Sequence, residues 1–198
     1  MRLLVATNNA GKVREYDDLL RGLDLELCRL ADIGLEWQVD ETGHTFDENA
    51  RLKAQAYCRA SHLLTLADDS GLEVTILGGA PGVHSARYAG QGASDADRIR
   101  KLLAALDGVP RDNRAARFRC VIALAWPDGR LETFEGQCEG VIALEPKGTN
   151  GFGFDPVFYL PELNCTMAEL PMDVKDRISH RARAAALVRE RLERLPPS

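Results

Sequence analysis

The chain has 198 residues, of which 45% are hydrophobic, and its 30 acidic and 25 basic side chains give a net charge of −5. This length and apolar content predict one domain with a well-buried core, residues 1–198, built as two lobes without a linker. No basic excess is present to follow a nucleic-acid backbone, so we expect no nucleic-acid polymer as ligand. A small polyphosphate fits the charge, because one or two lysines, a helix N-terminus and a divalent cation can neutralise it locally.

The cysteines and the hydropathy pattern predict the compartment. Five cysteines form no C-x-x-C pair, and their odd number argues against a disulfide framework. No stretch of about 18 consecutive apolar residues and no signal peptide are evident. We therefore expect a cytoplasmic protein without a membrane partner.

The first elements predicted are a strand over residues 3–6, a helix from about residue 13, and a second strand over residues 25–30. The loop between strand and helix is Thr7, Asn8, Asn9, Ala10, Gly11 and Lys12. A loop in this position turns backbone N–H groups and a lysine toward an anion, and glycine permits close approach of phosphate. The loop is not a Walker A motif, since Ala6 and Val13 stand where Gly and Ser or Thr are needed. Phosphate binding and an ordinary strand-to-helix turn both stay open.

A capping box formed by Thr45 and Glu48 predicts a helix over residues 46–62. Asn49 and Lys53, four residues apart, share one face of this helix, where they could present an amide and an ammonium to one ligand or belong to the solvated surface.

A buried strand is predicted over residues 63–67, a turn over residues 68–71, and another strand over residues 72–77. The turn would carry Asp68, Asp69 and Ser70. Two carboxylates on a turn could hold Mg²⁺, with Glu41 as a third acid, or could serve only local N–H groups.

Ser94 and Asp97 predict the start of another helix, which Gly108 and Pro110 end. An antiparallel hairpin is predicted from residues 117–126 and 131–134, followed by a strand near 138–145, a glycine-rich loop over 148–153, and a terminal helix over 179–195. Because helices and strands intermix throughout, we expect an α/β fold with a mixed sheet.

The second half of the chain offers aromatic and cationic candidates for binding a base. Phe152, Gly153, Phe154 and Asp155 lie on the glycine-rich loop, and each ring could stack on a base or anchor the loop to the core. Lys175, His180 and Arg181 cluster hydrogen-bond donors near the start of the final helix. The arginines of that helix, Arg181 among them, are interleaved with glutamates, which indicates a solvated face rather than a nucleic-acid patch.

Seven motifs in this order resemble one family, the inosine/xanthosine triphosphate pyrophosphatases, which remove deaminated purine nucleotides from the pool. The motifs are T-N-N-A-G-K, E-T-G-x-T-F-x-E-N-A-x-x-K-A, A-D-D-S-G-L, G-G-A-P-G, S-A-R-Y, F-G-F-D-P and S-H-R-A. The resemblance extends from about residue 3 to residue 190. It implies an elongated, two-lobed α/β protein around a long mixed twisted sheet, with the active-site cleft between the lobes, and a homodimer.

The resemblance also implies the reaction, in which ITP, dITP or XTP and water give the monophosphate and pyrophosphate with Mg²⁺ as the cofactor. It assigns residues 7–12 and Lys53 to the triphosphate, Glu41 and Asp69 to the metal, and Asp69 to the general base. It assigns Ser70 to a substrate contact, residues 152–155 to the base-reading loop, and Lys175, His180 and Arg181 to the remaining base-binding positions.

Three alternatives stay open at this point. A pyrophosphatase for modified pyrimidine nucleotides would share the architecture. A nucleotide-binding module without turnover would gain little from the retained acids. An RNA-binding role is opposed by the net acidity.

Overall fold

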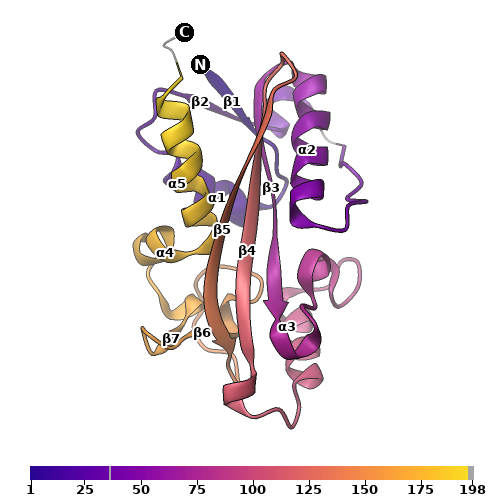
Figure 1. Ribbon diagram of the computed structural model, residues 1–198, viewed down its shortest axis with the longest axis vertical. Coiled ribbons are helices and arrows are strands. Elements are labelled where there is room, and N and C mark those ends of the chain that lie inside the picture. Colours follow the sequence, from indigo (N-terminus) through magenta and orange to yellow (C-terminus); the bar gives the residue numbers. More distant parts are fainter. Residues whose placement is uncertain (36, 196–198) are drawn as a thin grey trace. The chain divides into compact units, whose positions relative to one another are not determined.

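The computed structural model describes residues 1–35 and 37–195 (Figure 1). Its sheet has seven strands: β1 (Arg2–Val5), β2 (Glu26–Arg29), β3 (Leu64–Val74), β4 (Ala115–Ala125), β5 (Leu131–Ile142), β6 (Phe158–Leu160) and β7 (Cys165–Thr166). The α-helices are α1 (Ala10–Leu19), α2 (Phe46–Ser61), α3 (Asp95–Ala105), α4 (Met172–Ile178) and α5 (His180–Glu193). None of the helices in the described ranges is long and apolar enough to cross a membrane.

The strand order is β2-β1-β3-β4-β5-β6-β7. β1 pairs in parallel with β2 and β3, whereas β6 pairs antiparallel with β5 and β7. The predicted α/β fold with a mixed sheet is therefore confirmed, and so is the β-α-β unit at the N-terminus.

The described residues divide into two compact units, and β3, β4 and β5 contribute residues to each. The first unit comprises residues 1–35, 37–69, 120–136 and 181–195, and the second comprises residues 70–119 and 137–180.

Each unit has its own apolar core. In the first unit, Leu64 and Leu66 of β3 pack with side chains of β1, α1, β4 and α5. In the second, Leu72 and Val74 of the same strand pack with side chains of α3, β4, β5 and the residues near 154–170. In each unit the β3 residues that reach the core are two positions apart, as the two-residue period of a strand requires.

Both predicted capping boxes are present. Thr45 accepts a hydrogen bond from Glu48 N, and Ser94 accepts one from Asp97 N, while each acidic side chain bonds back to the capping residue. These local signals fixed the starts of α2 and α3 correctly.

The predicted break at residues 68–71 was wrong, because β3 runs through all four residues. Asp68 and Asp69 each have a cationic partner, so their burial in a strand is compensated. Gly71 lies against the next loop, where an added Cβ would be only 2.5 Å from Ser85 Oγ and Gly82 O. Turn-forming residues therefore adopt an extended conformation here for tertiary reasons. Residues 75–77, predicted as strand, form a 3-10 turn.

A second predicted break was also wrong, because residues 131–142 form one strand, β5. Its Gly140 allows β6 to pair closely, since an added Cβ would be 2.7 Å from the Phe158 ring. The short elements β6, β7 and α4 were not predicted. Ser179 is the C-cap of α4, so the final helix starts at His180.

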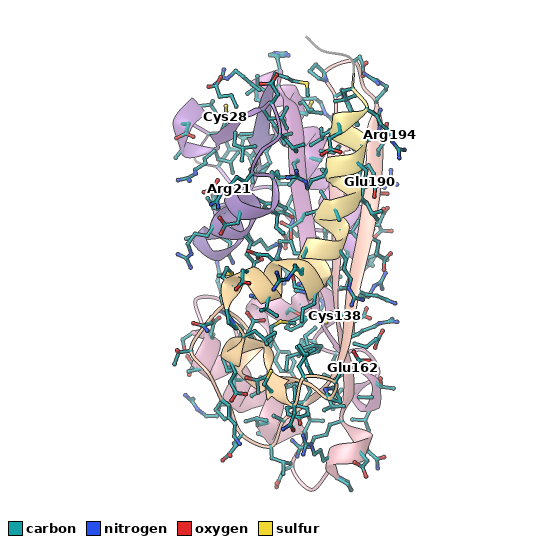
Figure 2. The ribbon with its side chains drawn as sticks, turned by 90° about the vertical axis from the view of Figure 1, so that its left-hand side faces the viewer. Arg21, Cys28, Cys138, Glu162, Glu190 and Arg194 are labelled. Atoms are coloured by element: carbon teal, nitrogen blue, oxygen red, sulfur yellow. The ribbon has the colours of Figure 1, made fainter. Side chains whose placement is uncertain are left out.

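The prediction of a solvated arginine face on the final helix holds for part of α5. Arg194 and Glu190, labelled in Figure 2, are exposed and form an i,i+4 pair. Arg181, at the start of the same helix, is instead fully buried, because it pairs with two carboxylates of the first unit.

Candidate functional site

The loop of residues 7–12 leads from β1 into α1. Asn9 is the helix N-cap, and its side-chain oxygen accepts from Gly11 N (2.8 Å) and Lys12 N (3.2 Å). Thr7 Oγ1 in turn accepts from Asn9 N. Asn8, Asn9 and Ala10 are exposed, so this loop presents its polar groups to solvent. The Asn9 side chain therefore accepts hydrogen bonds from the N–H groups of the first helical turn, which the sequence analysis considered as donors to an anion.

Asp68 faces one side of β3, where two cations surround it. Its Oδ2 lies 2.9 Å from Lys12 Nζ and 3.4 Å from the Arg181 guanidinium. Burial alone would raise the pKa of the Asp68 carboxyl, but Lys12 and Arg181 outweigh burial and hold that pKa well below its usual range. Asp68 is therefore a buried carboxylate that stays ionised and fixes the ammonium of Lys12.

Three further buried residues lie near Asp68 and Arg181, and none of them was predicted as a site residue. Glu15 of α1 pairs with Arg181, and both side chains are almost fully buried. Cys120 Sγ lies 3.7 Å from Asp68 Oδ2, and burial followed by the charge of Asp68 raises the pKa of the Cys120 thiol. The pKa of Tyr16 is also raised, chiefly by burial. In the sequence Glu15 is an ordinary charged residue of the predicted helix, because its partner Arg181 is 166 residues away.

Asp69 faces the other side of β3, toward α2. Asn49 Nδ2 donates to Asp69 Oδ2 (3.1 Å), and Lys53 Nζ lies 3.2 Å from Asp69 Oδ1. The same Lys53 Nζ lies 2.6 Å from Glu41 Oε1. Asn49 and Lys53, on one face of α2, thus contact Asp69, and Lys53 also contacts Glu41. Glu41 and Asp69 are the two acids that the resemblance assigns to a metal. We call these four residues the Asp69 cluster.

The electrostatics of the Asp69 cluster follow from its burial. Burial, and secondarily the charge of Glu41, raises the pKa of Asp69 above its usual value although Lys53 opposes this. For Lys53, burial lowers the pKa, but Asp69 and Glu41 outweigh it and the pKa is raised. Lys53 therefore stays protonated between the two carboxylates.

Two carboxylates of the Asp69 cluster already converge on one cationic group, which is an arrangement that suits a divalent cation. Glu41 and Asp69 direct oxygens at one point, which the Lys53 ammonium holds. Mg²⁺ commonly takes one or two carboxylates and leaves its other positions to water and phosphate. Asp68 does not contribute to this pair, because it points to the opposite face. Within residues 1–35 and 37–195, no group of three or more His, Cys, Asp and Glu converges as a metal site.

The second unit contains the glycine-rich loop, here residues 148–155. Asp155 Oδ2 accepts from Lys175 Nζ (2.5 Å) and from Phe152 N (2.9 Å). The side chains of Asp155 and Lys175 are both buried. Lys175 Nζ also lies 5.0 Å from the centroid of the half-buried Phe152 ring. Phe154 belongs to the core of this unit, so this ring anchors the loop, whereas Phe152 is the ring with exposed surface.

The remaining predicted residues are placed as follows. His180 is buried and stacks on Phe118, with ring centroids 4.7 Å apart. Ser70, the first residue of the second unit, is half-buried in β3. Arg181 is in the first unit, where its guanidinium pairs with Glu15 and Asp68.

These positions can be compared with known proteins. A model of the Ham1 family matches residues 3–191. The chain belongs to the Ham1 family. A dITP/XTP pyrophosphatase of Desulforamulus reducens is 51% identical over 195 residues, which are 98% of this chain and 97% of that protein. One of Geobacillus kaustophilus is 51% identical over 193 residues, which are 98% of this chain and 95% of that protein.

Solved Ham1 structures share the fold. A HAM1 protein from Coxiella burnetii is 41% identical with a TM-score of 0.90, and the match covers 98% of this chain and all of that one (100%). Membership of the Ham1 family confirms the family resemblance that the seven motifs predicted.

Proposed function

We propose that this chain is a nucleoside-triphosphate pyrophosphatase that hydrolyses ITP, dITP and XTP to the monophosphate and pyrophosphate, thereby removing deaminated purines from the nucleotide pool. The names of its Ham1-family relatives support this proposal. The observation that carries it is the Asp69 cluster, in which a buried carboxylate of raised pKa shares one ammonium with a second carboxylate.

Mg²⁺ is the cofactor of this proposal, and Glu41 and Asp69 are the residues that would hold it. When bound, Mg²⁺ makes a coordinated water more acidic and neutralises phosphate charge. Asn49 supports both ligands, because its Oδ1 accepts from Gly43 N (2.8 Å), close to Glu41, while its Nδ2 donates to Asp69. A two-carboxylate site completed by substrate phosphates suits the preference of Mg²⁺.

The chain's own residues perform the proton transfer and the charge neutralisation. Asp69 acts as the general base, and its raised pKa brings its basicity closer to that needed to accept a proton from water. The water oxygen attacks the α-phosphorus, and the bond from the α-phosphorus to the oxygen that bridges to the β-phosphorus breaks, so that pyrophosphate leaves with that oxygen. Lys53 and Lys12 neutralise the charge that grows on the pyrophosphate, and Asp68 keeps Lys12 oriented. Positioning and electrostatics supply most of the acceleration in such reactions.

The glycine-rich loop and its partners are proposed to read the base. The half-buried ring of Phe152 is the one that would stack on the base. Hypoxanthine and xanthine present a 6-oxo acceptor and an N1–H donor, for which Lys175 and Asp155 have complementary groups. Adenine reverses both, so ATP would leave buried polar groups unpaired, which can reduce efficiency by about 10⁴-fold. His180 is a further donor in this proposal.

A homodimer and a cytoplasmic location complete the proposal, the first from the family resemblance and the second from the cysteine usage. Sedimentation of the purified chain tests the first.

Hydrolysis of ITP in H₂¹⁸O tests the chemistry of the Asp69 cluster. We expect one ¹⁸O in inosine monophosphate and none in pyrophosphate, because water attacks the α-phosphorus. Label in pyrophosphate would contradict the proposal, and so would release of orthophosphate alone.

A further inference from the structure

Asp95 lies on the first turn of α3 and contacts the glycine-rich loop. Its Oδ2 accepts a hydrogen bond from Gly153 N at 2.7 Å, although 58 residues separate the two in sequence. Both residues belong to the second unit. The contact thus links α3 to the loop that carries Phe152.

Asp95 is not needed to cap its own helix. Ser94 is the N-cap, and the reciprocal bonds between Ser94 and Asp97 already satisfy the capping box. An acidic residue in the first turn usually serves only the helix dipole. Here the carboxylate of Asp95 is directed away from the cap and onto a backbone amide of another segment.

Arg98 fixes the orientation of the Asp95 carboxylate. Its guanidinium pairs with Asp95 Oδ1, and its Nη1 also donates to the carbonyls of Ala86 (2.7 Å) and Ala93 (2.8 Å). The Asp95 side chain is therefore held by an arginine that is itself anchored to two backbone groups.

The peptide group that Asp95 holds is the one between Phe152 and Gly153. Its N–H is bound by Asp95, and its carbonyl oxygen accepts from Asp155 N at 3.3 Å. Phe152 N is in addition bound by Asp155 Oδ2. Gly153 has a φ of +66°, a conformation that glycine adopts readily. Fixing this peptide plane fixes the direction in which the Phe152 side chain leaves the backbone.

We infer that Asp95 is a positioning residue for base recognition: it holds the Phe152–Gly153 peptide so that the Phe152 ring is presented to a purine. This inference rests on the proposed function and deepens it, because it assigns base affinity to a residue of α3. Asp95 touches no reacting atom in this account and has no part in phosphate binding.

The test compares Asp95→Ala, Asp95→Asn and the control Asp97→Ala, which removes a carboxylate from the same turn without a contact to the loop. Binding of ITP and of inorganic tripolyphosphate is measured by calorimetry, together with KM and kcat for ITP. Loss of a hydrogen bond to a charged group predicts that Asp95→Ala weakens ITP binding by about tenfold or more. Tripolyphosphate binding and kcat should stay near wild type, and Asp95→Asn should restore much of the loss because its amide oxygen can still accept from Gly153 N.

Amide hydrogen exchange provides a readout without turnover. The Gly153 amide should exchange faster in Asp95→Ala than in wild type and Asp97→Ala. Equal ITP binding in Asp95→Ala and wild type, or an equal loss of ITP and tripolyphosphate binding, would overturn the inference while leaving the proposed function intact. A wild-type protein that does not hydrolyse ITP would overturn both.

Discussion

Asp68 and Asp69 are adjacent in β3, and their side chains point to opposite faces of the strand. Asp68 meets Lys12 and Arg181, whereas Asp69 meets Asn49 and Lys53. Side chains alternate along a strand, so these two adjacent acids have different partners. In the proposed function Asp69 is the acid that would hold the metal, whereas Asp68 pairs with the cations of the other face.

Replacing Asp69 by Asn should abolish turnover and preserve the fold, because the amide keeps the size of the side chain but cannot accept the proton. General-base catalysis contributes about 10² to 10⁴-fold, so pyrophosphate release from ITP should fall by at least this factor. ITP binding, measured by calorimetry, should persist. Asp128→Asn, at an exposed residue paired with Arg130, is the matched control. Undiminished turnover in Asp69→Asn would remove the assigned base.

Replacing Glu15 by Gln should destabilise the first unit strongly. Glu15 and Arg181 are only 3% and 2% exposed, so the variant leaves a buried guanidinium with less compensation. Breaking such a pair costs about 3–5 kcal/mol. Asp173→Asn breaks the exposed pair with Arg177 and should change stability by about 1 kcal/mol or less. Denaturant unfolding of both variants checks the difference, and equal stabilities would contradict the importance given to this pair.

Replacing Gly151 by Ala should disrupt the Asp155–Lys175 pair. Gly151 has a φ of +76°, and an added Cβ would lie 2.0 Å from Asp155 Oδ2 and 2.9 Å from Lys175 Nζ. Gly78→Ala is the control, because Gly78 has a φ of +64° with no atom within 4 Å of the added Cβ. Both variants carry backbone strain of about 1–3 kcal/mol, but only Gly151→Ala should raise the KM for ITP. Equal KM values in the two variants would show that the pair does not support base binding.

The Cys120 thiol should resist alkylation in the native protein at mildly alkaline pH. Thiolates are the reactive form, and burial together with Asp68 raises the pKa of Cys120, so its thiolate fraction at a given pH is lower than that of an ordinary cysteine. After treatment with N-ethylmaleimide at pH 8, peptide mass spectrometry should find the half-buried Cys165 modified before Cys120. Both should react in denaturant. Native labelling of Cys120 at the rate of Cys165 would contradict the buried environment.

The parts of the structure that were predictable from sequence depend on local signals. The capping residues Thr45 and Ser94 predicted the starts of their helices, and the spacing of Asn49 and Lys53 predicted their shared face. These features depend on residues within one turn or two of each other, so a single sequence contains them.

The parts that failed depend on partners distant in sequence. Residues 68–71 have turn composition, but in the structure Lys12 and Lys53 pair with Asp68 and Asp69, and Ser85 accepts from the N–H of the next residue, Leu72. The sequence pattern around Arg181 predicts a solvated helix face. In the structure Arg181 is buried and pairs with Glu15, which is 166 residues away in sequence. The contact between Asp95 and Gly153 likewise joins elements whose proximity only the fold creates.

The proposed Mg²⁺-dependent hydrolysis of ITP and XTP is tested most directly by measuring pyrophosphate release by the purified chain. The substrates are ITP, XTP, GTP and ATP, each with Mg²⁺ and with a chelator in its place. We expect pyrophosphate from ITP and XTP in the presence of Mg²⁺, far less from ATP, and none with the chelator. Preference for ATP, orthophosphate as the sole phosphate product, or undiminished activity with the chelator would contradict it.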